Sequence, residues 1–168
     1  SRALFSSDAA HVIGPVFTPD GFAVMEAESG RTVAHFPQVG SFHHAAVRPA
    51  AHQFAAYTDG KVLLIDWDVG RVVDEFPYPA GARRLAWSPD GRLLAIGGSA
   101  LNVHVWDIPS RTLREFPGHA DTVIDLLVDP AGERLAVVSM DGSTRMWDLR
   151  DQRLLGVTGD RRLACGVA

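Results

Sequence analysis

A repeat of about forty residues constrains this chain more than any other feature of its sequence. Four similar segments follow one another, with first residues 40, 41 and 41 positions apart: Met25–Phe36, Ile65–Phe76, Trp106–Phe116 and Trp147–Val157. A second marker, at a turn earlier in each repeat, keeps the same spacing: Ser7, Pro49, Pro89 and Pro130. Because two independent markers stay in phase, the repeat is a real property of the sequence.

The third repeat shows most clearly what each unit is expected to form. Short apolar runs over residues 84–88, 92–98, 103–107 and 111–116 are separated by turn residues, and none has a helical apolar period. Four short strands joined by tight turns are typical of one blade of a β-propeller. A single blade leaves two apolar faces uncovered, so consecutive blades are expected to stack face to face.

This spacing divides the chain into four expected blades, over about residues 1–40, 41–80, 81–119 and 120–160. Residues 161–168 are predicted to be the first strand of a truncated fifth repeat or a closing tail. The expected fold is all-β, with four four-stranded antiparallel blades. Since propellers have about 4–8 blades, we expect these four to be part of a larger ring or to be completed by another chain.

The fourth repeat resembles the WD40 family, whose units of about 40–45 residues carry a Gly-His and a Trp-Asp pair. The resemblance is carried by these residues: Gly118-His119, Ser139, Asp141-Gly142 and Trp147-Asp148. In that family the His, Ser, Asp and Trp form a hydrogen-bonded chain between outer and inner strands. The resemblance therefore implies a WD40-type β-propeller and a structural hydrogen-bond tetrad of His119, Ser139, Asp141 and Trp147. A fully satisfied polar network of this kind would fix the strand register.

The three earlier repeats depart from the family pattern. The third keeps the Trp-Asp pair as Trp106 and Asp107, but the second has Ile65 at the tryptophan position. The first repeat has Met25 and Glu26 in place of the pair. We expect these three blades to depend on apolar packing rather than on the polar chain.

Composition excludes several classes of partner. A net charge of -4 and a pI of about 5.9 provide no general attraction to nucleic acid or anionic lipid, so neither is an expected partner. No apolar run approaches the roughly 20 residues of a membrane span.

Cys165, the only cysteine, cannot form an internal disulfide, which favours a reducing, cytoplasmic location. Lys61 and Asn102 are the only lysine and asparagine, which indicates a GC-rich and bacterial genome.

The sequence predicts no catalytic residues, no metal site and no cofactor. The seven histidines are scattered, and the adjacent His43 and His44 would point to opposite faces of a strand. No HxH or ExxH spacing and no GxSxG motif occurs. The alternative is a propeller hydrolase with a site in the central channel. For that site the first strands offer only His43 or His44 and Asp125, too few for a catalytic set.

The resemblance implies an interaction platform with a protein or peptide partner. We expect a non-catalytic scaffolding module, the sensing or docking part of a larger bacterial signalling protein. Its candidate partner-binding rim consists of Tyr78, Arg83, Leu101 and Met140, of which Tyr and Arg are residue types that often dominate binding energy. A third alternative is a purely structural role, in which copies of the chain, or further blades in cis, complete the ring.

Overall fold

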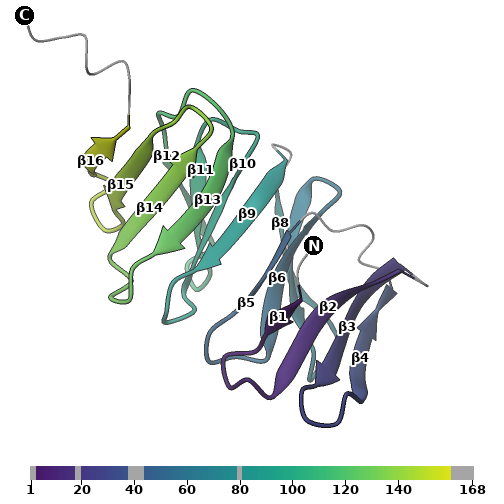
Figure 1. Cartoon of the computed structure of the whole chain (residues 1–168). Helices are drawn as coiled ribbons and strands as arrows, with labels where there is room; N and C mark the ends of the chain where they lie inside the picture. Colours follow the sequence, from purple (N-terminus) through teal and green to yellow (C-terminus); the bar gives the residue numbers. More distant parts are fainter. Residues whose placement is uncertain (1–2, 18–19, 38–43, 79–80, 160–168) are drawn as a thin grey trace, which may run out of the picture. The chain divides into compact units, whose positions relative to one another are not determined.

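The structure, a computed structural model, describes residues 3–17, 20–37, 44–78 and 81–159. Sixteen strands form four antiparallel sheets of four strands each, and the described residues contain no α-helix (Figure 1). The predicted all-β fold with four blades is therefore confirmed. The described part of the chain also lacks any helix long and apolar enough to cross a membrane. The predicted tail, residues 161–168, lies outside the described residues.

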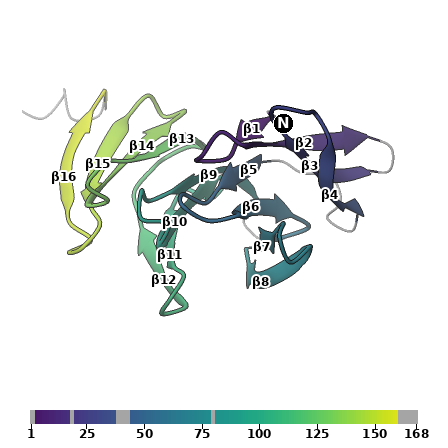
Figure 2. The same cartoon turned by 90° about the horizontal axis from the view of Figure 1, so that it is seen from below.

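The first of two compact units, Ser1–Gly81, contains two sheets. The strands of the first sheet are β1 (Leu4–Phe5), β2 (His11–Phe17), β3 (Asp20–Glu26) and β4 (Thr32–Phe36). Those of the second are β5 (His44–Val47), β6 (Gln53–Thr58), β7 (Lys61–Asp66) and β8 (Arg71–Pro77). Within each sheet, every strand pairs with the next strand along the chain, as Figure 2 shows for β5 to β8.

The core of this first unit is formed by apolar side chains from both of its sheets. Phe22 of β3 stacks on Phe54 of β6 with ring centroids 5.6 Å apart, and both rings are fully buried. Phe36 packs edge-on against Phe54 at 5.9 Å. The two blades thus bury their apolar faces against each other, as the repeat predicts.

The second unit, Ala82–Ala168, contains the other two sheets. The strands of the third sheet are β9 (Ala82–Trp87), β10 (Leu93–Gly98), β11 (Val103–Asp107) and β12 (Thr112–Phe116). Those of the fourth are β13 (Val123–Val128), β14 (Arg134–Ser139), β15 (Thr144–Asp148) and β16 (Leu154–Thr158). Phe116 of the third sheet packs edge-on against Trp147 of the fourth, with centroids 5.6 Å apart.

The aspartate that ends the third strand has the same local role in the second, third and fourth blades. Asp107 accepts a hydrogen bond from the Ser110 N–H at 3.2 Å, which stabilises the turn before β12. Asp148 accepts from two N–H groups of the turn before β16, and Asp66 does the same before β8. These are Asx-type turns, in which a short carboxylate replaces a backbone acceptor. Trp106, the tryptophan of the Trp-Asp pair in the third blade, lies opposite Leu94 in the sheet and is half-buried.

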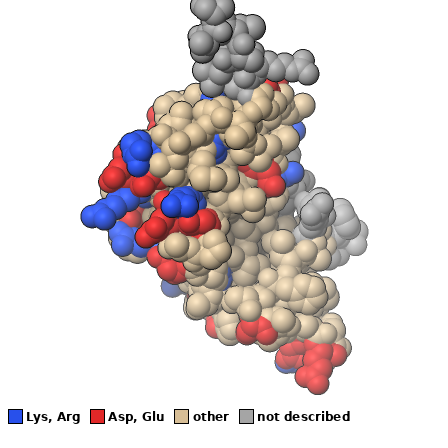
Figure 3. Space-filling view, turned by 60° about the vertical axis from the view of Figure 1, so that its left-hand side comes forward, with Lys and Arg blue, Asp and Glu red and all other residues tan. Residues whose placement is uncertain are grey.

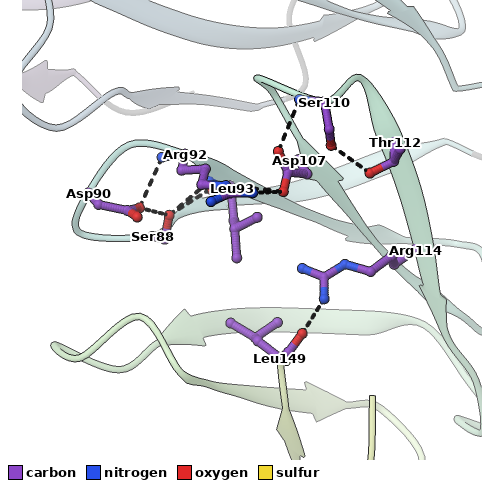
Figure 4. A network of polar contacts seen from close by, with 9 residues as sticks. All are labelled: Ser88, Asp90, Arg92, Leu93, Asp107, Ser110, Thr112, Arg114 and Leu149. Atoms are coloured by element: carbon purple, nitrogen blue, oxygen red, sulfur yellow. Dashed lines mark hydrogen bonds and ion pairs between the residues drawn. The ribbon is translucent and has the colours of Figure 1, made fainter. Parts of the chain in front are cut away.

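Polar contacts also connect strands and blades in the second unit. Both Nε and Nη2 of Arg92 donate to one oxygen of Asp107, at 3.1 and 2.8 Å (Figure 4). The Arg114 guanidinium of β12 donates to the Leu149 carbonyl, which belongs to the neighbouring blade. In the first blade, Glu26 accepts from its own turn and from an arginine side chain. These contacts add to apolar packing in the first and third blades, and the expectation that the first three blades do not use the His-Ser-Asp-Trp chain stays a prediction.

Candidate functional site

The loop of residues 117–122, between β12 and β13, is held by both blades of the second unit. The His119 N–H donates to the Leu101 carbonyl, in the turn between β10 and β11, at 3.2 Å. At the other end of the loop, the Thr122 carbonyl accepts from the Met140 N–H at 2.9 Å. The turns that follow β10 and β14 therefore lie against one common loop.

Asp141 is the main hydrogen-bond acceptor at this end of the fourth blade. Its Oδ2 accepts from the Ala120 N–H at 2.8 Å, and its Oδ1 accepts from the N–H and hydroxyl of Ser143 at 2.8 and 2.6 Å. Burial raises the pKa of Asp141, but these hydrogen bonds outweigh it and hold the pKa well below its usual range. The Ser139 hydroxyl donates to the Asp121 carbonyl at 3.0 Å and accepts from the Asp141 N–H at 3.2 Å.

His119 fills the space beneath this loop as a neutral side chain. Its ring is fully buried, and its Nδ1 lies 3.4 Å from Asp141 Oδ2, close enough for attraction but outside hydrogen-bond geometry. Burial lowers the pKa of His119, and the nearby Arg145 charge lowers it further, while Asp141 opposes both effects. The imidazole therefore packs as an uncharged group at neutral pH.

The structure brings three of the four predicted tetrad residues to one end of the fourth blade: His119, Ser139 and Asp141. Trp147 lies further along the blade, opposite Leu135, and the residue is 7% exposed. Among the described residues, its Nε1 has no hydrogen-bond partner. The continuous four-residue chain stays a prediction for this protein.

Sequence reasoning missed Ala120, Asp121, Thr122 and Ser143 as members of this network. Three of them contribute backbone atoms, which no side-chain motif can reveal. Ser143 does leave a signal, because Asp-Gly-Ser is a sequence typical of an Asx turn.

Three of the four predicted rim residues are exposed in the second unit. Leu101 is 50% exposed and Met140 is 64% exposed, although both belong to turns held by hydrogen bonds. Arg83 is exposed at the start of β9, where the adjacent Ala82 pairs with Gly98 at the end of β10. Arg83 therefore lies at the same end of its blade as Leu101.

Tyr78 does not belong to an exposed rim, and its assignment as a partner contact is wrong. The residue is only 3% exposed, and its ring lies edge-on to Tyr57 with centroids 6.3 Å apart. Its N–H donates to the Gly60 carbonyl at 2.7 Å. The flanking prolines suggested a surface loop, but the aromatic ring gains more from burial than from exposure.

The polar residues considered for a catalytic site in the central channel belong to different units of the structure. His44 is half-buried on β5 of the first unit, and His43 lies outside the described residues. Asp125 is exposed on β13 of the second unit, with Oδ1 4.0 Å from Arg84 Nε. On the face drawn in Figure 3, acidic and basic side chains are intermingled rather than sorted by sign.

Comparison with known proteins agrees with this geometry. The family model "WD domain, G-beta repeat" of WD40 matches residues 75–107 and 110–148. The chain is 34% identical over 107 residues to the COMPASS component SWD3 of Saccharomyces cerevisiae, covering 61% of this chain and 34% of that protein. It is 33% identical over 111 residues to the protein groucho of Drosophila melanogaster, covering 58% of this chain and 15% of groucho.

A third relative, the UBP9-binding protein bun62 of Schizosaccharomyces pombe, is 34% identical over 96 residues, covering 53% of this chain and 18% of bun62. The chain thus spans about a third or less of the length of these relatives. Both family-model matches include a Trp-Asp pair, at Trp106-Asp107 and at Trp147-Asp148. The two matched segments are therefore WD40 repeats, and the four four-stranded sheets of the chain have the architecture of WD40-type β-propeller blades.

Proposed function

We propose that this chain is a non-catalytic protein-interaction module whose docking surface consists of Arg83, Leu101 and Met140. The observation that carries the proposal is the exposure of Leu101 and Met140, at 50% and 64%, on turns that hydrogen bonds hold in place. Exposed apolar side chains on a rigid frame lose little conformational freedom when a partner binds.

The chemistry of this surface indicates the kind of partner. Leu101 and Met140 flank one loop and present apolar side chains, and Met adapts well to irregular partner surfaces. Arg83 adds a guanidinium at the same end of the third blade, which favours a carboxylate. The proposed partner is therefore a protein segment with apolar side chains next to an acidic one.

The relatives and the composition support a scaffolding role within a larger assembly. One relative is named as a component of COMPASS, and another is named as a protein that binds UBP9. We further propose that the chain serves as the sensing or docking part of a cytoplasmic, bacterial signalling protein. The scarcity of lysine and asparagine and the single cysteine support that context.

A random peptide library displayed on phage tests this docking surface without a known partner. Peptides are selected on the wild-type chain, and their Kd is then measured for Leu101→Ser, Met140→Ser and Arg83→Ala. We expect each serine variant to weaken binding about tenfold, because apolar anchors dominate small interfaces. The selected peptides should combine apolar and acidic residues.

Leu113→Ser is the matched control, since Leu113 is 44% exposed but lies on β12, away from the two turns. It should leave the Kd unchanged. Peptides that bind all three variants as tightly as the wild type would assign docking to another surface.

A further inference from the structure

Two histidines and a carboxylate lie together in the first unit, although the sequence indicates no metal site. Asp8 lies in the turn before β2, His11 is the first residue of β2, and His52 immediately precedes β6. One ligand atom from each lies within 4.8 Å of those of the other two. His11 and His52 are 41 residues apart, which is one repeat, so stacking of neighbouring blades brings them together.

One oxygen of Asp8 is available to a ligand. Its Oδ1 accepts a hydrogen bond from the Ser6 hydroxyl and another from the Ala10 N–H, which lies 3.0 Å away. Its Oδ2 lies 3.8 Å from His52 Nε2. Because Ser6 and Ala10 donate to Oδ1, Oδ2 is the oxygen that is left facing His52.

His52 is oriented by a second carboxylate. Its Nδ1 lies 2.7 Å from Asp68 Oδ2, so the tautomer with the proton on Nδ1 donates a hydrogen bond to this carboxylate. Nε2 then carries the lone pair on the side of Asp8. A histidine whose second nitrogen donates to a carboxylate is the usual arrangement around protein-bound zinc.

His11 supplies the third ligand. Its Nδ1 is buried and, among the described residues, has no hydrogen-bond partner. A buried ring nitrogen without a partner is unfavourable, and a bound ion or water would relieve it. Trp67 closes one side of the cluster, with its ring centroid 5.3 Å from that of His52 and 5.9 Å from that of His11.

We propose that Asp8, His11 and His52 bind a divalent transition-metal ion of the Zn²⁺ class, with Asp68 orienting His52. Zn²⁺ takes nitrogen and carboxylate ligands at about 2.0–2.2 Å, which places tetrahedral donors about 3.3 Å apart. The 3.8 Å between Asp8 Oδ2 and His52 Nε2 therefore closes with a small side-chain shift. Both side chains have room for it, being 50% and 44% exposed. In this proposal a solvent water supplies the fourth ligand.

Titration of the purified full chain with Zn²⁺ by calorimetry, and with Co²⁺ by visible absorption, tests the proposal. We expect one equivalent of Zn²⁺ and a Co²⁺ spectrum of a four-coordinate site with nitrogen and oxygen ligands. His52→Gln and Asp8→Asn should each weaken Zn²⁺ binding at least tenfold. Asp68→Asn should weaken it about tenfold, since it removes only the orienting partner.

The third blade provides a matched control for the carboxylate. Asp90 lies in an equivalent turn, accepting from the Ser88 hydroxyl and the Arg92 N–H, but Leu93 occupies the position of His11. Asp90→Asn should leave Zn²⁺ binding unchanged, as should His35→Gln, which removes an exposed histidine of β4.

Circular dichroism verifies that each variant is folded. If His52→Gln or Asp8→Asn does not fold, His11→Gln takes its place in the Zn²⁺ titration. Absence of Zn²⁺ binding to the wild type, or equal affinity in folded His52→Gln and Asp8→Asn, would overturn the proposal. In that case the cluster is only a set of ion pairs between His52 and its two carboxylates.

Discussion

Asp141 and His119 show how single residues set the pH dependence of this fold. Hydrogen bonds from Ser143 and Ala120 keep the pKa of Asp141 low, so its contribution to stability is present above about pH 3.9 and is lost on acidification below that value. His119 also has a lowered pKa, because burial disfavours its charge. Since the unfolded chain protonates this histidine more readily, stability falls as the pH decreases below about 6.5.

Replacement of His119 by glutamine should flatten the dependence of Tm on pH between 5 and 6.5. One histidine that protonates only on unfolding contributes at most about 1.4 kcal/mol per pH unit, so the change in slope is measurable by calorimetry. Burial also lowers the pKa of His104, so this histidine still makes Tm depend on pH in the His119→Gln variant. Replacement of the exposed His35 is the control, and an unchanged slope in His119→Gln would contradict the argument.

At the scale of strands, the contact between β10 and β13 depends on the absence of one side chain. A Cβ added to Gly97 would lie 2.8 Å from Val123 Cγ1 and 3.3 Å from Leu126 Cδ1. Val123 is fully buried and β-branched, so its side chain has little freedom to move away. The small residue therefore sets how closely the third and fourth blades approach.

Gly97→Ala should destabilise the chain by about 1–3 kcal/mol, the usual cost of overpacking a core. Gly156 on β16 is the matched control, because a Cβ added there meets nothing within 4 Å. Gly156→Ala should be neutral or slightly stabilising, since alanine restricts the unfolded chain. Chemical denaturation of both variants measures the difference, and equal effects would show that the Gly97 contact is not tight.

At the scale of the whole molecule, one face of the fourth blade presents apolar side chains to solvent. Leu127, Ala136 and Met146 are cross-strand neighbours and lie on the same face, where Leu127 is 61% exposed and Met146 is 42% exposed. Ile124, on the same strand as Leu127, is also exposed, at 40%. In propeller folds such a face is normally covered by a neighbouring blade.

We expect the 168-residue chain by itself to associate through this face, giving a light-scattering mass above 18.1 kDa that rises with concentration. Leu127→Glu should shift the distribution toward the monomer, because association would bury an unpaired charge. Val69→Glu is the control, since Val69 is 58% exposed in a turn of the first unit. A wild-type chain that stays monomeric at high concentration would exclude completion of the ring by identical copies.

Much of the fold follows from local sequence. The third blade was expected over residues 84–88, 92–98, 103–107 and 111–116, and its strands are Ala82–Trp87, Leu93–Gly98, Val103–Asp107 and Thr112–Phe116. Short apolar runs and turn residues determine where strands begin and end, because both act through neighbours in the chain. The exposure of Leu101 and Met140 follows in the same way, since turns between adjacent strands lie at the surface.

Tertiary structure alone decided which distant side chains meet and which are buried. Tyr78 lies between prolines in a segment that resembles a surface loop, yet packing against Tyr57 buries it. His11 and His52 share no local motif, and only the stacking of two blades places them in one cluster. Strand and turn signals act over a few residues, whereas burial and ligand geometry depend on side chains that neighbouring blades supply.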